Sequence, residues 1–350
     1  MNVRPERLMI YGNVQAARAL AALAVLAYHM GLLPFGQCGV DIFFVISGFI
    51  MSHVAPGDEH GFMRKRLIRI VPLYWLSTVG VYVIAVLRPN WLNTTTASVP
   101  YLVKSLLFIP FVKANGHWGP LNLNGWTLEY EMFFYLVIAL AMTVIRPRFA
   151  TAAAATALAV YSASICLLKP QNPVAVYLGQ PFVLEFGLGV LSYWLVKSGL
   201  TGRISRGAWM TFAIVSVAMM PLYYCMKGAP TGLVRVGVYG IAAFVFMTAL
   251  IAVETGGWSI RSSLISYLVG RLGAASYAIY LLHPYIVGML RKLLTVQTNM
   301  SGWREAAIAL IVITVVCVVG DACHVLVEKP ILALLNHRFR RSRSHGVSPT

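Results

Sequence analysis

The chain has 350 residues, of which 59% are hydrophobic and only 11% are charged. A soluble domain carries about 25% charged residues, so this composition excludes an ordinary soluble protein. The net charge of +17 is better explained by loops that face an anionic cytoplasmic leaflet than by nucleic-acid binding, because the sequence contains no soluble basic domain.

Apolar segments of about membrane-spanning length recur along the chain and predict an all-α integral membrane protein, a bundle of about ten transmembrane helices. They cover residues 12–30, 38–54, 71–87, 127–145, 150–168, 176–196, 208–226, 233–253, 272–290 and 305–327. The stretch 99–113 is too short to span and contains Lys104, so we expect it to be interfacial or re-entrant within one larger extracytoplasmic loop, 88–126. We expect one transmembrane domain, 1–335, and a disordered basic cytoplasmic tail, 336–350.

The distribution of Lys and Arg predicts the orientation in the membrane. With the N-terminus in the cytoplasm, roughly two thirds of the 28 Lys and Arg residues fall on the inner side, so both termini are expected to be cytoplasmic. If 99–113 crossed the membrane, every later segment would reverse. The five cysteines form no CxxC pair and no cluster with zinc spacing, so we expect neither a disulfide framework nor a metal site.

The first apolar segment contains two costly polar groups, Arg18 near its start and His29 near its end. Their separation corresponds to about 20° more than three helical turns, so both side chains share one face, about 16 Å apart. Charged groups in a membrane helix usually face a partner or a water-filled cavity, which favours a functional role. Two simpler explanations stay open: Arg18 could snorkel to the inner interface, and His29 could make a hydrogen bond between helices.

Carboxylates stand at the outer ends of two further segments. Asp41 lies close to the expected level of His29, where it could hold the imidazole tautomer or simply cap the helix. Glu129 and Glu131 fall in the first turns of segment 127–145, where a helix N-terminus favours acidic residues. We assign capping to Glu129, and we weight Glu131 towards function because it is deeper and aromatic residues flank it.

The predicted polar groups converge at one depth. His283, near the outer end of segment 272–290, joins His29, Asp41 and Glu131, so that four helices contribute to the outer half of the membrane. Four such groups predict one cavity. Further residues are assigned supporting positions at this cavity: Trp126, Glu185, Ser47 and Tyr280.

Basic residues cluster before the third segment, on the expected inner side. Arg64, Lys65, Arg66 and Arg69 would be explained by a positive-inside anchor alone. Arginine also binds phosphate through a bidentate fork, and Arg66 and Arg69 share a face if this stretch is helical. Together with Arg18, they could therefore bind an anionic cytosolic ligand.

Taken in order, these motifs resemble the acyltransferase-3 family of membrane-bound sugar O-acyltransferases over roughly residues 10–330. The marks are Arg18 and His29, "GVDIFFVISGF", "RKRLIRIVPLYW", "GWTLEYEMFFYL", "SYAIYLLHP" and the closing "VEKP". The compact chain and the "LNGWTLEYEMFFY" variant are most similar to the exopolysaccharide-production acyltransferases. Many members carry a C-terminal extracytoplasmic SGNH-type esterase domain, which we expect this chain to lack.

The resemblance implies an acyl-CoA donor inside, acetyl by default, and a polysaccharide or lipid-linked glycan acceptor outside. It places the essential histidine at His29, the arginine at Arg18 and the glutamate at Glu131. Acyl-CoA is then a co-substrate, and no cofactor or metal is expected. The expected setting is a bacterial cytoplasmic (inner) membrane, with membrane lipid, and with a polysaccharide-synthesis complex as a further partner; no nucleic acid is expected.

The mechanism that we expect uses Arg18, Arg66 and Arg69 to bind the CoA phosphates and His29 as general base or nucleophile. Glu131 or Asp41 would orient the imidazole. Two rival functions remain: a flippase or acyl-group transporter that uses buried His and carboxylates without acyl transfer, and a non-catalytic scaffold of a glycan-synthesis complex. The absence of a visible inverted repeat counts against the common secondary transporters.

Overall fold

The computed structural model describes residues 12–58, 61–92, 95–114, 116–257, 263–293 and 302–344, with residue 263 and residues 338–344 described by their backbone alone. Within these ranges the elements are helical, and β pairing is confined to a single bridge between Val112 and Trp118. The all-α class that the sequence predicts is therefore confirmed.

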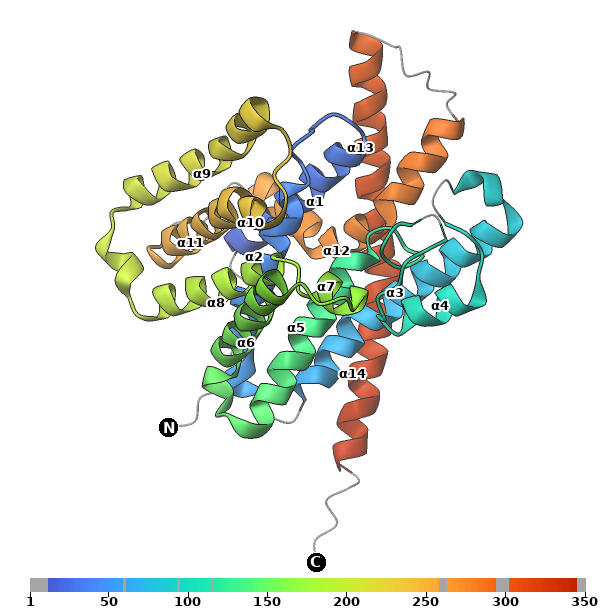
Figure 1. The fold of residues 1–350 in the computed structure, drawn as a ribbon. Helices are drawn as coiled ribbons and strands as arrows, with labels where there is room; N and C mark the ends of the chain where they lie inside the picture. The colour runs from blue at the N-terminus through green and yellow to red at the C-terminus, as the bar shows by residue number, and fades with distance from the viewer. Residues whose placement is uncertain are drawn as a thin grey trace, which may run out of the picture. The chain divides into compact units, whose positions relative to one another are not determined.

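The helices follow the predicted apolar segments (Figure 1). In chain order they are α1 (Gly12–His29), α2 (Cys38–Val54), α3 (Phe62–Leu87), α4 (Val99–Leu106), α5 (Gly125–Val144), α6 (Pro147–Leu168), α7 (Pro173–Leu178), α8 (Val183–Lys197), α9 (Arg206–Lys227), α10 (Gly232–Arg235), α11 (Ile241–Thr255), α12 (Ser263–Leu293), α13 (Trp303–Cys323) and α14 (Lys329–Ser344).

Nine helical stretches in the described ranges are long and apolar enough to cross a membrane. They correspond to every predicted segment except the first, because Asn13, Gln15 and Arg18 lower the hydropathy of the 18-residue helix α1. The helical path also continues through 336–344, the first part of the tail for which the sequence favours disorder. The residues after Ser344 lie outside the described chain.

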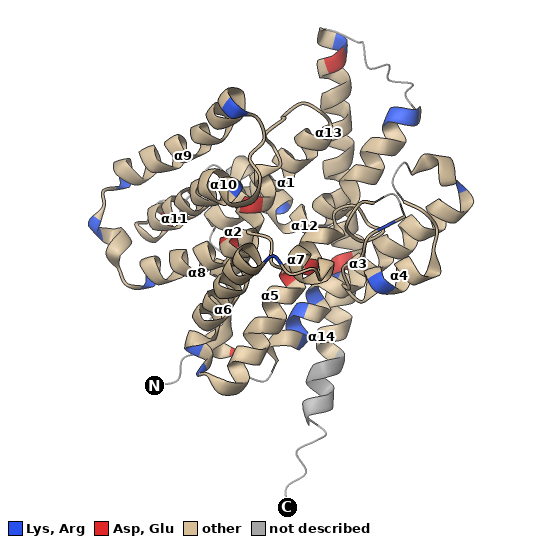
Figure 2. Cartoon of the chain, in the orientation of Figure 1, with Lys and Arg blue, Asp and Glu red and all other residues tan. Residues whose placement is uncertain are grey.

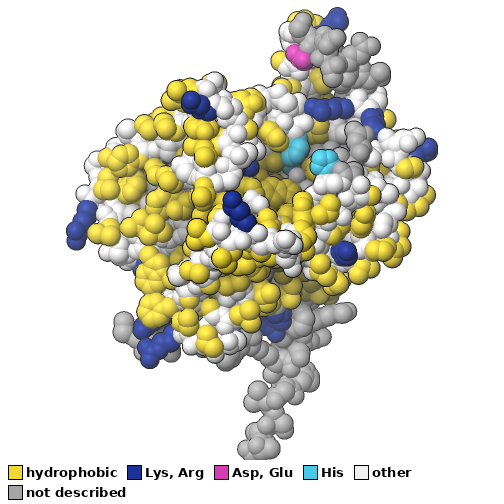
Figure 3. Space-filling model, in the orientation of Figure 1, with side chains coloured by type: hydrophobic (Ala, Val, Ile, Leu, Met, Phe, Trp, Pro, Cys, Tyr) yellow, Lys and Arg dark blue, Asp and Glu magenta, His cyan; other side chains and the backbone are white. Residues whose placement is uncertain are grey.

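The outer surfaces of the helices are apolar, as a lipid environment requires. Leu167 and Leu168 at the end of α6 expose 81% and 78% of their surfaces. Charged residues are sparse along the helices (Figure 2), and hydrophobic side chains cover much of the face drawn in Figure 3. Together with the nine candidate spans, this surface identifies a multi-pass membrane protein.

The chain divides into two compact units. The first unit comprises Met1–Glu59 and Val137–Ser276, and the second comprises His60–Leu136 and Tyr277–Thr350. Two of the three boundaries fall within helices, one in α5 and one in α12, and the third lies between residues 59 and 60.

A glycine contact between α2 and α8 organises the first unit. A Cβ added at Gly48 would lie 2.0 Å from the carbonyl oxygen of Phe186, and one added at Gly189 would lie 2.1 Å from that of Val45. Gly39 meets α1 in the same way, with an added Cβ 2.3 Å from the carbonyl oxygen of Ala21. Only glycine lets the backbones come this near.

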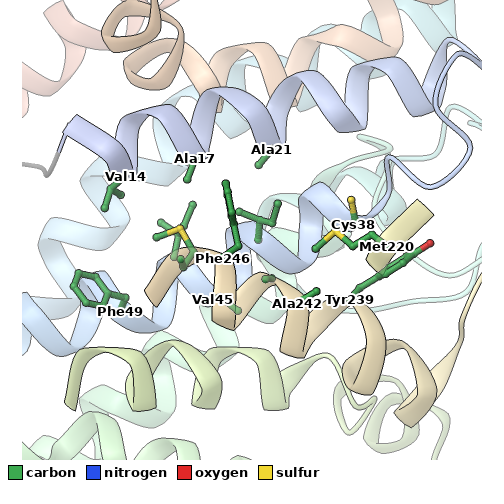
Figure 4. Close-up of a cluster of buried hydrophobic side chains, with 14 of the residues drawn as sticks. Val14, Ala17, Ala21, Cys38, Val45, Phe49, Met220, Tyr239, Ala242 and Phe246 are labelled. Carbon is green, nitrogen blue, oxygen red and sulfur yellow. The ribbon is translucent and has the colours of Figure 1, made fainter. Parts of the chain in front are cut away.

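Small and aromatic side chains fill the space between α1, α2 and α11 (Figure 4). Ala17 and Ala21 of α1 are fully buried, and Phe246 of α11 packs into the same cluster. Cys38 and Tyr239 lie at one end of this cluster, as Figure 4 shows. α1 is therefore a core helix of the first unit despite its polar residues.

A π-helical turn, Val236–Gly240, joins α10 to α11. The two α-helices are thus continuous through one wider turn. A second π-helical turn, His324–Glu328, joins α13 to α14, and His324 Nδ1 lies 2.7 Å from Glu328 Oε2. π-turns are rare and occur frequently at functional sites. Hydropathy gives no sign of either turn.

In the second unit, α3 supports the short helix α4. The hydroxyl of Tyr74 donates to the carbonyl of Ser105 at 3.0 Å, and the indole N–H of Trp75 donates to the carbonyl of Leu106 at 2.8 Å. α4 has only 8 residues, far fewer than the roughly 20 that a span requires. The prediction that 99–113 is too short to cross the membrane is confirmed.

Candidate active site

His29 is the last residue of α1, and its ring is held in one tautomer. Its Nδ1 lies 3.0 Å from the carbonyl oxygen of Val25, one helical turn earlier. Because a carbonyl can only accept, Nδ1 of the neutral ring donates its proton there. Nε2 then carries the lone pair, which is the state that a general base or a nucleophile needs.

Arg18 lies on the same helix as His29 and is buried, with 8% of its surface exposed. Since α1 is helical over the whole interval, the two side chains share a face as predicted. A lipid-facing side chain that snorkels would be exposed in a structure without lipid. The burial of Arg18 therefore favours an interior role.

Asp41, in the first turn of α2, is bound by an arginine that the sequence analysis did not select. Arg235 donates from Nε to Oδ1 at 2.9 Å and from Nη2 to Oδ2 at 2.7 Å. Asp41 is fully buried and Arg235 is 7% exposed. Both carboxylate oxygens thus serve a bidentate ion pair, and the suggested role of Asp41 in orienting His29 stays a prediction.

The sequence did contain a signal for Arg235. This residue falls inside the predicted apolar segment 233–253. An arginine within an apolar span is costly unless it is paired. An arginine at such a position predicts a buried acidic partner, but the sequence does not identify which acid it is.

Glu185 of α8 lies beside the same ion pair. It is fully buried, and Asp41 and Arg235 are the charged groups that act on it. A Cβ added at Gly240 would lie 3.1 Å from Glu185 Cγ, so the π-helical turn makes room for this side chain. Ser47, the other supporting residue predicted in the first unit, is 7% exposed on α2.

Glu131 lies on α5 in the second unit, where the hydroxyl of Tyr135 donates to its Oε1. The charges of Glu131 and Arg69 both act on the phenol of Tyr277. That phenol donates to the carbonyl of Ile70 on α3 at 2.8 Å. Tyr135 and Tyr277, which are not among the residues predicted from the sequence, thus bind Glu131 and the backbone of α3, respectively.

The basic cluster occupies the N-terminal turns of α3. Arg64, Lys65 and Arg66 stand in its first turns, which contain no acidic residue, and no side chain caps the helix at Gly61. Arg66 is half-buried, with its guanidinium 5.7 Å from the ring of Phe62. Positive side chains add to the positive end of the helix dipole, an arrangement that favours an anion such as phosphate.

His283 is fully buried on α12 and has the same ring geometry as His29, with Nδ1 3.1 Å from the carbonyl of Ile279. Tyr280, one turn earlier, exchanges a 3.0 Å hydrogen bond with Thr127 of α5. Trp126 packs edge-on against Tyr130 at 6.0 Å between ring centroids. Tyr280 and Trp126 thus both contact the N-terminal turns of α5.

A buried charge of each sign stands near the start of α5. Lys113 is 7% exposed and Glu129 is 2% exposed. Burial lowers the pKa of Lys113, and the negative charge of Glu129 opposes part of that shift. The capping role assigned to Glu129 from the sequence stays a prediction, and its charge acts on Lys113 within the second unit.

The predicted site residues divide between the two units. The first unit contains His29, Arg18, Asp41, Ser47 and Glu185, and the second contains Glu131, Arg66, Arg69, His283, Trp126 and Tyr280. The single cavity expected from their common depth stays a prediction. Among the described residues, no three His, Cys, Asp or Glu side chains come together as a metal site would need.

Comparison with known proteins identifies the class to which this helical bundle belongs. The chain belongs to the family described as Acyltransferase domain, which matches residues 11–321. It is therefore a multi-pass membrane acyltransferase. No solved structure matches it.

Three relatives indicate the range of the family. The chain is 30% identical to "Exopolysaccharide production protein ExoZ" of Rhizobium meliloti (strain 1021), over 89% of this chain and 92% of that protein. It is 26% identical to "Acyltransferase MdmB" of Streptomyces mycarofaciens, over 95% of each chain. It is 25% identical to "Peptidoglycan O-acetyltransferase OatA" of Listeria monocytogenes serovar 1/2a, over 91% of this chain but only 55% of that protein.

Proposed function

We propose that this protein transfers an acyl group, acetyl by default, from cytosolic acyl-CoA to a hydroxyl of an extracytoplasmic or lipid-linked polysaccharide. The names of its relatives, an exopolysaccharide production protein and a peptidoglycan O-acetyltransferase among them, support a glycan acceptor. The observation that carries the chemistry is the contact between His29 Nδ1 and the carbonyl of Val25, from which we infer that Nε2 carries the lone pair of the neutral ring.

Two routes use that lone pair. As a general base, Nε2 accepts the proton of the sugar hydroxyl while the hydroxyl oxygen attacks the carbonyl carbon of the thioester. The carbon–sulfur bond then breaks, and the imidazolium gives the proton to the CoA thiolate that leaves. As a nucleophile, Nε2 attacks the thioester itself and forms an acyl-imidazole, which the sugar hydroxyl then cleaves. Both routes yield one ester and one CoA thiol.

The donor site that we propose combines Arg18, Arg66 and Arg69. Arg18 is buried on the same helical face as His29. This position supports a role in binding the CoA end of the donor while the pantetheine arm extends towards His29. The basic N-terminal turns of α3 support phosphate binding around Arg66 and Arg69. Acyl-CoA carries its phosphates at one end and the thioester at the other, so an inner basic site and an outer histidine suit its shape.

The carboxylate that stabilises the imidazolium is, in this proposal, Glu131 rather than Asp41. Asp41 already neutralises Arg235 through both oxygens. Glu131 is half-buried on α5 and accepts from Tyr135. A carboxylate in this role holds the ring and stabilises its charged form without itself taking the proton.

The test is acyl transfer in proteoliposomes with radiolabelled acetyl-CoA and the native polysaccharide, analysed by mass spectrometry. His29→Ala should abolish ester formation, while His53→Ala, at the exposed end of α2 in the same unit, should retain it. Full activity in His29→Ala would overturn the proposal. Wild-type protein that releases no CoA thiol would instead favour a transporter or a scaffold.

The same assay separates the two routes. Without acceptor, the nucleophilic route should leave radiolabel on His29 after rapid quenching, whereas the general-base route should leave none.

For orientation, we propose an inner membrane with both termini cytoplasmic, following the excess of Lys and Arg on that side.

A further inference from the structure

Arg235 has a second set of contacts besides Asp41. Its Nη1 donates to Gln37 Oε1 at 3.3 Å, and its Nη2 donates to the Gln37 carbonyl oxygen at 3.2 Å. Its guanidinium also lies 5.0 Å from the centroid of the Phe182 ring. One buried side chain thus binds both the residue before α2 and the first turn of α2.

The segment that Arg235 binds is the connection that follows His29. α1 ends at His29 and α2 begins at Cys38, so the residues between them form a short turn. The turn folds back on α1, because the N–H groups of Leu32 and Leu33 both donate to the carbonyl of Ala27, at 2.9 and 3.2 Å.

Two glycines fix this turn against α1 at backbone distance. A Cβ added at Gly36 would lie 2.2 Å from the carbonyl oxygen of Ala24, and one added at Gly39 would lie 2.3 Å from that of Ala21. A displacement of the turn must therefore move the last turns of α1, which carry His29. Since packed interiors transmit strain, the position of the imidazole depends on the position of the turn.

We propose that Arg235 is a positioning residue for His29: by binding Gln37 and Asp41, it fixes the turn that sets the imidazole for acyl transfer. The inference rests on the proposed role of His29. In this proposal Arg235 does not contact either substrate, because its guanidinium is already bound to Asp41 and Gln37. It acts through the 30–41 segment, and the planar fork of the guanidinium supplies a geometry that a lysine ammonium does not reproduce.

The nearby carboxylates explain why an arginine occupies this position. Asp41 and Glu185 are both fully buried, and each acts on the other beside Arg235. The guanidinium therefore lies against a pair of buried acids. A lysine would keep the charge but would lose the fork, so Arg235→Lys separates positioning from charge compensation.

The experiment measures kcat and both KM values for folded Arg235→Lys protein in proteoliposomes, with folded protein quantified by size-exclusion chromatography. We expect kcat per folded molecule to fall roughly tenfold or more, because a misplacement of about 1 Å can cost a hundredfold. Both KM values should stay within about twofold of wild type, since the substrates do not contact Arg235. The matched control is Arg206→Lys, an exposed arginine of the same unit that binds only the Gly256 carbonyl in the described contacts; its kcat should not change.

A purely structural role would lower the yield of folded protein and leave its kcat unchanged, and that result would overturn the inference. If Arg235→Lys does not fold, Gln37→Ala decides: a kcat reduced about threefold with constant KM supports positioning, and an unchanged kcat refutes it. His29→Ala, tested in parallel, keeps the two proposals apart. Activity in that variant removes the proposed function, whereas an inactive His29→Ala beside a wild-type kcat in Arg235→Lys removes only this inference.

Discussion

The crossing of α2 and α8 gives the sharpest prediction of stability. In Gly48→Ala, the new Cβ would meet the carbonyl oxygen of Phe186 at 2.0 Å, whereas ordinary contacts begin near 3.4 Å. The two backbones must separate by about 1.4 Å, and overpacking of this kind typically costs about 1–3 kcal/mol. We expect the upper end, about 3 kcal/mol, because the obstructing atom belongs to the backbone and cannot rotate away.

Gly187→Ala is the matched control, two residues before the crossing point Gly189 on the same helix. Its added Cβ would meet the Ala155 methyl at 3.6 Å, an ordinary contact. This substitution should be neutral or slightly stabilising, since alanine favours helix over glycine by up to about 1 kcal/mol. The assay is equilibrium unfolding in detergent micelles, followed by circular dichroism. Equal free energies of unfolding for the Gly48→Ala and Gly187→Ala variants would refute the reasoning.

Three further predictions concern the donor, the orientation and the buried lysine. Arg66→Ala and Arg69→Ala should raise KM for acyl-CoA several-fold and leave the acceptor KM unchanged, with only partial rescue by lysine; equal effects on both substrates in initial-rate measurements would contradict phosphate binding. In intact cells, a cysteine introduced at Asn90 should increase labelling by an impermeant thiol reagent above that of the unsubstituted chain, and one introduced at Gly202 should not; the reverse pattern would show that the orientation is opposite to the one proposed. Burial lowers the pKa of Lys113, so just below pH 10.5 the unfolded state binds more protons than the folded state. The free energy of unfolding should therefore rise with pH in this range, and unfolding measured as a function of pH should show a smaller rise for Lys113→Met.

Hydropathy alone predicted where the helices lie, because the cost of exposing backbone and charge to lipid acts locally along the sequence. It did not predict where all of them end. α3 begins at Phe62, well before the expected start at 71, because the basic residues that precede the apolar segment are also helical. The segment 176–196 is interrupted around Gly179 and Pro181, which separate α7 from α8.

The candidate site was predictable only where it depends on residues close in sequence. Arg18 and His29 share a helix, and their common face follows from helical geometry. The pairing of Asp41 with Arg235 joins residues 194 positions apart, which no local pattern specifies. The tautomer of His29 depends on a backbone carbonyl, so side-chain identity gave no indication of it.

The π-helical turn Val236–Gly240 has a consequence for how this chain can vary in length. A loop absorbs the deletion of one residue by tightening, but a helix changes its phase, because each residue contributes about 100° of rotation. A π-helical turn uses one residue more than an α-helical turn for about the same rotation, so loss of one residue from 236–240 would restore a regular α-helix and keep Arg235 nearly in phase with the α11 face that carries Phe246. Single-residue deletions among natural variants should therefore occur in loops or at 236–240 and should avoid the regular turns of α11.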